Sequence, residues 1–282
     1  MMFGRIYRRL KRGYVTTVGT PLARGRARSL GARVVGALPT PPEPVPAEHA
    51  MRLNLAEGVK HPSVKLDGAF GDNSVLTIDR RIPARMKIHI RVSAPTPPTN
   101  VRLQIGHVKT GRISIAVAGS NVDMQIGHTN RLIAQIGVGQ NSLVRVGDRT
   151  TSSGIEISCM DGIVRIGSDC QSGGGSMVMG AAHHGIVALR KGRARIVRQK
   201  PEVHVGDHVW LGFRSYVGGR ARIGSGCIVA ACSSVVSPMP PDCLIAGNPA
   251  AIRRRNVGWS RDAKSIDEHS QHYFKSVVWQ SS

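Results

Sequence analysis

Aliphatic residues recur at a fixed spacing of six in the C-terminal half of the chain. Glycine directly follows the first four of them, at positions 206, 212, 218 and 224. The aliphatic positions are Val205, Leu211, Val217, Ile223, Val229 and Val235. A helix face repeats every 3.6 residues and an amphipathic strand every two, so this period fits neither of them. It predicts short strands separated by turns, each with one aliphatic side chain pointing into a shared core.

A longer repeat of about 20 residues precedes this region. An aliphatic residue followed by glycine occurs at Ile105, Ile126, Val146 and Ile166, with spacings of 21, 20 and 20. Five positions before each of these residues stands Asn or Asp, which tolerate left-handed backbone angles better than other non-glycine residues. Together with Asn73, which lies five residues before Ile78, the series is Asn73, Asn100, Asn121, Asn141 and Asp161. Three strands of about six residues per coil account for both periods.

Stacked coils of this kind predict an all-β fold, a parallel β-solenoid in which each coil buries its apolar face on the next. The narrow core leaves little room for large rings, which explains why no aromatic residue occurs between Phe70 and Trp210. His107 and His128 occupy the position after Ile-Gly, where other coils have Asp or Ser. That placement is typical of exposed corners, so we expect no metal.

Charge and proline content divide the chain into three predicted parts. Residues 1–46 form a basic arm and a Pro-rich linker, residues 47–255 form the solenoid domain with a protruding loop near 180–200, and residues 256–282 form a tail with a short helix. Residues 1–42 contain nine Lys or Arg and no acid, and apolar residues between Phe3 and Tyr14 have helical spacing. We expect this arm to contact an anionic membrane surface, with a solvated tail or a cleaved presequence as alternatives.

Composition narrows the classes of function. The chain has 39 Lys and Arg against 17 Asp and Glu, a formal net charge of +22, and 41% hydrophobic residues, enough for a sizeable core. No apolar run approaches the roughly 18 residues of a membrane-spanning helix. We expect no nucleic acid partner, because most of the chain lacks aromatic stacking platforms. Five cysteines without a Cys-x-x-Cys pair favour core residues of a reducing compartment, so we expect a cytoplasmic protein, with peripheral contact at the inner membrane face.

Three segments resemble the hexapeptide-repeat acyltransferases: VGDHVWLG at 205–212, IGSG at 223–226 and GNPA at 247–250. The resemblance is greatest to the branch that O-acetylates sugars and polysaccharides, and it extends over residues 65–260. It implies a left-handed parallel β-helix, which is an exception to the right-handed rule for parallel crossovers. It also implies a homotrimer with active sites between subunits.

The regular pitch breaks once, because Ile166 and Val205 are 39 residues apart, about twice the usual coil. A loop must therefore project between them. In the family this loop carries the catalytic histidine within a pattern close to Ser-Asp-Gly-His-Ser-Ile, and ungapped counting places it at His184, with His183 on the family's glycine. The resemblance implies that His184 is the general base, a task that suits a side chain that titrates near neutral pH.

The same residue-by-residue match implies how an acyl-CoA would bind. The backbone N–H of Phe213 would stabilise the tetrahedral oxyanion. The remaining cofactor-binding positions follow the CoA molecule from its pantetheine arm to its phosphates, and they are Trp210, Gly212, Ala231, Ser237 and Arg254.

Three segments of the chain depart from the family pattern. Ala182 stands where the family has an acid two residues before its histidine, so another group would have to orient His184. Val236-Ser237-Pro238 replaces a common Thr-Lys-Asp, and Ala230 and Cys232 replace glycines along the expected CoA track.

The expected function is an acetyl-CoA-dependent O-acetyltransferase that acts on a hydroxyl of a saccharide or glycolipid, with His184 as general base. An enzyme that acylates a sugar amine would carry the same pattern. The alternative from another class is a non-catalytic β-solenoid scaffold that binds a polyanion or a membrane through its charge.

Overall fold

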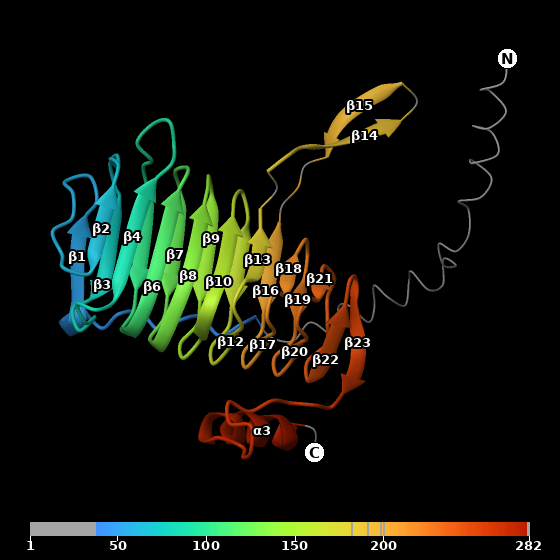
Figure 1. The fold of residues 1–282 in the computed structure, drawn as a ribbon. Helices are drawn as coiled ribbons and strands as arrows, with labels where there is room; N and C mark the ends of the chain where they lie inside the picture. Colours follow the sequence, from blue (N-terminus) through green and yellow to red (C-terminus); the bar gives the residue numbers. More distant parts are fainter. Residues whose placement is uncertain (1–37, 182, 191, 198, 200, 281–282) are drawn as a thin grey trace. The chain divides into compact units, whose positions relative to one another are not determined.

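The computed structural model describes residues 38–280 except 182, 191, 198 and 200. The expected surface helix of the basic arm lies outside the described residues. Parallel strands stacked in coils form most of this part of the chain (Figure 1). A short 3₁₀ helix, η1 (Ala47–His49), precedes the coils and helix α3 (Glu268–Gln280) follows them. Among the described residues, no helix has the length and apolar content to span a bilayer.

One side of the coils is an eight-stranded sheet, here called face 1, with the order β1-β3-β5-β7-β9-β11-β16-β19. All neighbours in it run parallel except β1, which pairs antiparallel with β3. Its strands are β1 (Ala50–Asn54), β3 (Val75–Asp79), β5 (Val101–Ile105), β7 (Val122–Ile126), β9 (Ser142–Val146), β11 (Ile163–Ile166), β16 (Glu202–Val205) and β19 (Arg222–Ile223).

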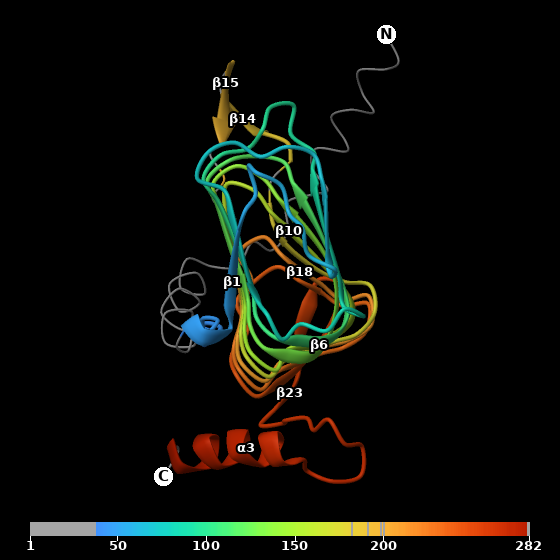
Figure 2. The same ribbon diagram turned by 90° about the vertical axis from the view of Figure 1, so that its left-hand side faces the viewer.

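A thirteen-stranded sheet supplies the other two sides, faces 2 and 3. Face 2 contains β12 (Gln171–Ser172), β17 (Trp210–Leu211), β20 (Ile228–Val229), β22 (Cys243–Gly247) and β23 (Ala250–Arg255). Face 3 contains β2 (Val64–Asp67), β4 (Lys87–Val92), β13 (Ser176–Gly180), β18 (Tyr216–Gly218) and β21 (Ser234–Val235). The long strands β6 (Val108–Val117), β8 (Thr129–Val138) and β10 (Thr151–Cys159) run through both faces. Along the chain, corner 1 joins face 1 to face 2, corner 2 joins face 2 to face 3, and corner 3 returns to face 1 (Figure 2).

The long strands differ from the expected three short strands per coil. β6 and β8 have ten residues each, and β10 has nine. Gly111 and Gly154 explain the difference, because their φ angles of 131° and 143° bend the strand at corner 2 without ending it. A Cβ at Gly111 would also lie within 2.0 Å of the Leu132 carbonyl oxygen. In the coils after β10, separate short strands on faces 2 and 3 replace these long strands.

The buried core runs along the axis of the coils. All six aliphatic residues of the six-residue repeat are buried, none with more than 3% of its surface exposed, which confirms the predicted inward face. Four of the five cysteines are buried as well, and Cys232 is exposed.

Corner 3 carries the predicted turn residues. All five have positive φ angles, between 47° and 58°. The side-chain amide of Asn73 donates to Asn100 at 3.3 Å, and the same contact continues coil by coil to Asp161 at 3.2, 3.0 and 2.9 Å. This ladder stabilises the left-handed conformation that a non-glycine residue otherwise adopts at a cost of about 1–2 kcal/mol.

Corner 1 carries a second ladder, built from the residues that follow Ile-Gly. The His107 N–H donates to His128 Nδ1 at 2.9 Å, and the His128 N–H donates to Asp148 Oδ1 at 2.7 Å. The Asp148, Ser168 and Asp207 N–H groups likewise donate to a side chain of the next coil, at 3.1, 2.7 and 3.0 Å. The two histidines therefore belong to a structural series.

Residues 38–46, here called the strap, lie along the coils. Pro39, Pro42 and Val45 are buried, a period of three that matches a polyproline II segment with one side packed. Thr40 donates to Asp207 through its backbone N–H at 3.1 Å, and the Glu43 N–H donates to Asp148 at 2.8 Å. The strap thus uses carboxylates of the corner 1 ladder, and the segment expected as a linker packs on the β-helix.

The C-terminal tail is fastened at corner 1 by a buried cluster, here called the tail clamp. His208 is 1% exposed and lies between the rings of Trp259 and Tyr273, with centroids 4.5 and 4.6 Å away. Its Nδ1 faces Asp169 Oδ2 at 2.8 Å and its Nε2 faces the Trp259 carbonyl oxygen at 3.0 Å. The ring therefore links Asp169 of the β-helix to the backbone of the tail. Arg261 completes the clamp with a contact of 3.0 Å to Asp169 Oδ1.

Candidate functional site

Corner 2 brings backbone atoms of successive coils into close contact. The registers of β12, β17 and β20 place Gly173, Gly212 and Ala230 at equivalent positions. A Cβ at Gly173 would lie 2.7 Å from the Phe213 nitrogen, and one at Gly212 would lie 2.6 Å from the Ala231 nitrogen. Only glycine at these two positions keeps the amide groups of the next coil uncovered.

The next position in each coil has an unpaired backbone donor. The N–H groups of Gly174, Phe213 and Ala231 make no hydrogen bond within the described part of the chain, and we call them the amide row. The residues just before them are paired, with Gly173 donating to Leu211 at 2.8 Å, for example. Unpaired N–H groups at an exposed corner can be solvated, and they can bind a carbonyl oxygen or an oxyanion.

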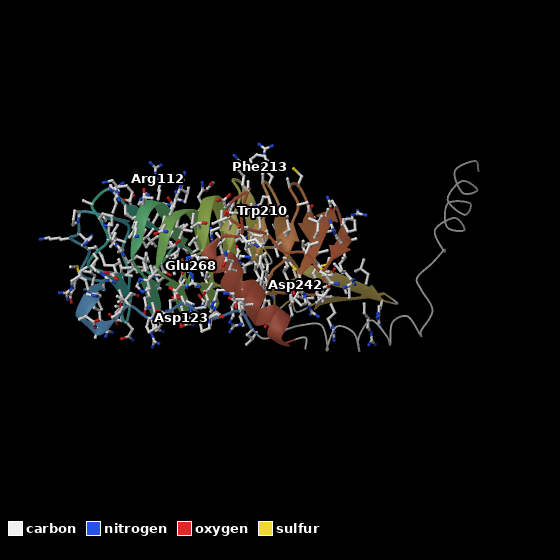
Figure 3. All side chains as sticks on the ribbon, turned by 90° about the horizontal axis from the view of Figure 1, so that it is seen from below. Arg112, Asp123, Trp210, Phe213, Asp242 and Glu268 are labelled. Atoms are coloured by element: carbon white, nitrogen blue, oxygen red, sulfur yellow. The ribbon has the colours of Figure 1, made fainter. Side chains whose placement is uncertain are left out.

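Exposed rings flank the amide row. Trp210 is 41% exposed and Phe213 is 53% exposed. The Arg214 guanidinium lies 5.0 Å from the centre of the Phe213 ring, a cation–π distance. Behind Trp210, the ring of Trp259 lies 6.2 Å away, so the tail clamp supports this ring from inside. Figure 3 shows Phe213 on the same side of the β-helix as Arg112 and on the opposite side from Asp123.

The structure therefore brings together Trp210, Gly212, Phe213 and Ala231, four of the predicted site residues. The other two predicted cofactor contacts lie elsewhere. Ser237 is exposed and follows β21, at corner 3. Arg254 is exposed on β23, where it pairs with Leu244 of β22 at the edge of face 2.

His184 lies on a different corner from the amide row. The predicted loop leaves face 3 after β13 and returns to face 1 at β16, so it projects from corner 3 (Figure 1). Both His183 and His184 are exposed at its start. Within one chain the structure does not bring His184 and Phe213 together. Ala182, the departure expected to affect His184, lies outside the described residues.

The projecting loop contains an antiparallel hairpin of β14 (Ile186–Arg190) and β15 (Arg193–Val197). One side of this hairpin is entirely apolar and carries Val187, Leu189, Ala194 and Ile196. Leu189 is 79% exposed and Ile196 is 62% exposed. Side chains of this kind are normally covered by a partner surface.

Sequence reasoning missed Gly173 and Gly174. The signal was present, because Gly173 and Gly212 are 39 residues apart, as are Ile166 and Val205. Continuing the register through the long coil would have placed Gly174 next to Phe213. Across the described part of the chain, no group of three or more His, Cys, Asp or Glu side chains is arranged to hold a metal.

Comparisons with known proteins agree with this architecture. Residues 202–236 match the family described as bacterial transferase hexapeptide (six repeats), which confirms the resemblance of that segment. The polySia specific acetyltransferase NeuO has the same fold, with a TM-score of 0.67 and 23% identity over 77% of this chain and 100% of that chain. The polysialic acid O-acetyltransferase OatWY gives a TM-score of 0.53 and 19% identity over 76% and 98%. The expected left-handed parallel β-helix is confirmed.

Proposed function

We propose that this protein is an acyltransferase that moves an acetyl group from acetyl-CoA to a hydroxyl of a saccharide. The amide row is the observation that carries the proposal, because its unpaired donors lie at an exposed corner and Trp210, on the strand that leads into this corner, is exposed as well. The names of the two solved structures with this fold support a saccharide acceptor, since both describe O-acetylation or acetylation of polysialic acid. The scaffold alternative has no comparable support in the described residues.

The chemistry assigns a role to each group. His184 takes the proton of the acceptor hydroxyl while that oxygen attacks the thioester carbon. The carbonyl oxygen becomes an oxyanion, which the Phe213 N–H stabilises. The intermediate then collapses, the carbon–sulfur bond breaks, and the imidazolium returns the proton to the CoA thiolate. Trp210 packs on the pantetheine arm, and Arg254 meets the phosphates.

A single chain does not complete this site, because His184 is at corner 3 and Phe213 at corner 2. We infer that the protein is a homotrimer in which the loop of one subunit brings His184 to corner 2 of the next. The exposed apolar side of the β14–β15 hairpin supports this assembly, since a second subunit would cover it. A cytoplasmic location remains a prediction from the cysteines, and membrane contact through residues 1–42 remains a prediction from charge.

The test is acetyl transfer by the His184→Ala variant, with His183→Ala as the matched control. Loss of the general base is expected to lower kcat by about 10²–10⁴-fold, while the neighbouring histidine changes it little. Circular dichroism and size-exclusion chromatography check that both variants fold and assemble. Transfer by His184→Ala within about threefold of wild type would remove His184 from the mechanism.

A further inference from the structure

A continuous line of hydrogen-bond donors follows the outer surface of face 1. Strand registers align one residue from each of the eight strands in a single row. At about 4.8 Å per strand, the seven steps of this row extend over about 34 Å. Each member carries an N–H or O–H donor. We call it the donor row, and its members are Arg52, Thr77, Gln104, Gln125, Arg145, Arg165, His204 and Arg222.

The donor row and its surroundings carry excess positive charge. The row itself contains no acid, and the three acids on the strands of face 1 already have partners. Asp79 pairs with Arg81 at 2.6 Å. Asp123 pairs with Arg145 at 2.9 Å, and Glu202 pairs with His204 at 2.6 Å and Arg222 at 3.2 Å. Within the described residues, the side chains of Arg52, Arg102 and Arg165 make no hydrogen bond or salt bridge, although the charge of Arg165 contributes to lowering the pKa of Glu202. These arginines remain available to an external anion.

Two buried polar atoms on the row also lack partners. Gln104 Nε2 and His204 Nδ1 are two of the three buried side-chain nitrogen or oxygen atoms without a hydrogen bond in the described part of the chain. Gln104 lines a hollow of about 700 Å³ that also contains Arg52, Arg102 and Arg145. Gln104 Nε2 is a donor, and a buried donor without an acceptor costs about 1–3 kcal/mol, which a ligand oxygen would relieve. His204 Nε2 faces Glu202, so Nδ1 of the neutral ring is an acceptor that a ligand hydroxyl would satisfy.

In the described part of the chain, the strap adds one acid near the row, Glu43, whose exposed side chain forms no salt bridge with a residue of the row. The strap borders the row, and its carbonyl groups accept only from Gln125, at 3.1 and 3.3 Å. Residues 1–42 contain nine Lys or Arg and no acid. The arm that precedes the strap is therefore positively charged, as the row is. Like charges repel, and this favours an external partner.

We propose that face 1 binds a linear anionic saccharide along the donor row, as a second site separate from corner 2. The row runs parallel to the axis of the coils, so a chain molecule would meet one donor per coil. Arginine matches a carboxylate, and the amide and hydroxyl side chains match sugar hydroxyl groups. Such a site would hold a polymeric acceptor while its sugars reach corner 2, and in this respect the inference rests on the proposed function.

Binding of long polysialic acid chains to the full-length protein, without acetyl-CoA, tests the proposal. The double variant Arg52→Gln/Arg102→Gln is expected to weaken the affinity at least about tenfold, because each guanidinium supplies a charge-assisted hydrogen bond. The matched control is Arg112→Gln/Arg131→Gln, which removes the same charge from exposed positions on β6 and β8. Affinity of this control should stay within about twofold of wild type, and dextran, a neutral polymer, should bind neither protein.

Activity separates this inference from the proposed function. Acetyl transfer to a monomeric sugar should be unchanged in Arg52→Gln/Arg102→Gln, while the KM for long chains rises. If polysialic acid binds at face 1 but no transfer occurs with any acceptor, the proposed function fails and the face 1 site stands. Equal weakening by both double variants, no weakening by either, or equally tight binding of single-stranded DNA would overturn the proposed saccharide site.

Discussion

Corners 1 and 2 belong to the same coils but differ in whether their backbone N–H groups have hydrogen-bond acceptors within the chain. At corner 1, the side chains of His128, Asp148, Ser168, Asp207 and Ser225 each accept from the N–H of the preceding coil. At corner 2, the amide row has no such partners in the described residues. Side chains thus satisfy the backbone at one corner, and the other leaves its donors for an acceptor outside the chain.

The two corners also differ in what covers them. The strap and the tail clamp pack on corner 1, so its polar groups are buried and need partners within the chain. Corner 2 remains exposed, and water can satisfy its amides until a ligand replaces it. Burial therefore identifies corner 1 as structural, and exposure together with unpaired donors identifies corner 2 as the candidate site.

The largest expected effect comes from covering the amide row. The Gly173→Ala substitution places a Cβ 2.7 Å from the Phe213 nitrogen, so it blocks the donor proposed for the oxyanion. Loss of one such donor is expected to lower kcat by about 10²–10³-fold. Acetyl-transfer kinetics measure the effect. Gly137→Ala is the control, since a Cβ there meets no heavy atom within 4 Å.

Circular dichroism and thermal unfolding should accompany these rates, because the backbone near Gly173 must shift to accept a methyl group. A folded Gly173→Ala protein with wild-type kcat would show that the Phe213 amide is not the oxyanion donor.

The next largest effect is expected at corner 1. Burial alone would raise the pKa of Asp169, but hydrogen bonding from His208 and the charge of Arg261 outweigh it and lower that pKa. Asp169→Asn removes the buried carboxylate that faces both His208 and Arg261, so docking of residues 256–280 should weaken by about 3 kcal/mol. Hydrogen exchange of α3 amides at neutral pH measures the change. Asp262→Asn, at an exposed acid of the same tail, is the control.

Because the pKa of Asp169 is lowered in the folded protein, docking of the tail should depend on pH. Its stabilising contribution is complete above the ordinary Asp pKa of about 3.9 and is lost as pH falls through the lower folded value. Protection factors of the α3 amides, which divide out the pH dependence of intrinsic exchange, should therefore fall in acid in the wild type and change less with pH in Asp169→Asn. The same acid response in both proteins would show that another group controls docking of the tail.

Regular repetition made the coils predictable. Val205 and its successors are buried because each coil presents the same face to one axis, and Asn100 and Asn121 stack because corner 3 recurs at a constant pitch. These features depend on neighbouring coils alone. A period in the sequence was therefore enough to predict them, whereas Trp210, Phe213 and Ala231 at corner 2 were expected only from the resemblance to the hexapeptide-repeat acyltransferases.

Contacts between distant segments were not predictable in the same way. The strap reaches Asp207 from Thr40, and His208 lies between Trp259 and Tyr273. No repeat connects these pairs, and each depends on the path of a non-repetitive segment. His184 is a similar case, because the sequence predicted a projecting loop, while its place on corner 3 follows from strands β13 and β16.

The smallest expected effect is a change in the alkylation rate of Cys232 at corner 2. Its thiol is exposed, whereas burial raises the pKa of the Cys170 and Cys227 thiols to about 12 and keeps them unreactive. Cys232 directly follows Ala231 of the amide row, so bound CoA should slow alkylation of this thiol severalfold. Mass spectrometry after brief exposure to iodoacetamide, with and without CoA, measures the protection. Free adenosine, which lacks the pantetheine arm, is the control and should protect little. Equal alkylation of Cys232 with and without saturating CoA would place the pantetheine arm away from corner 2.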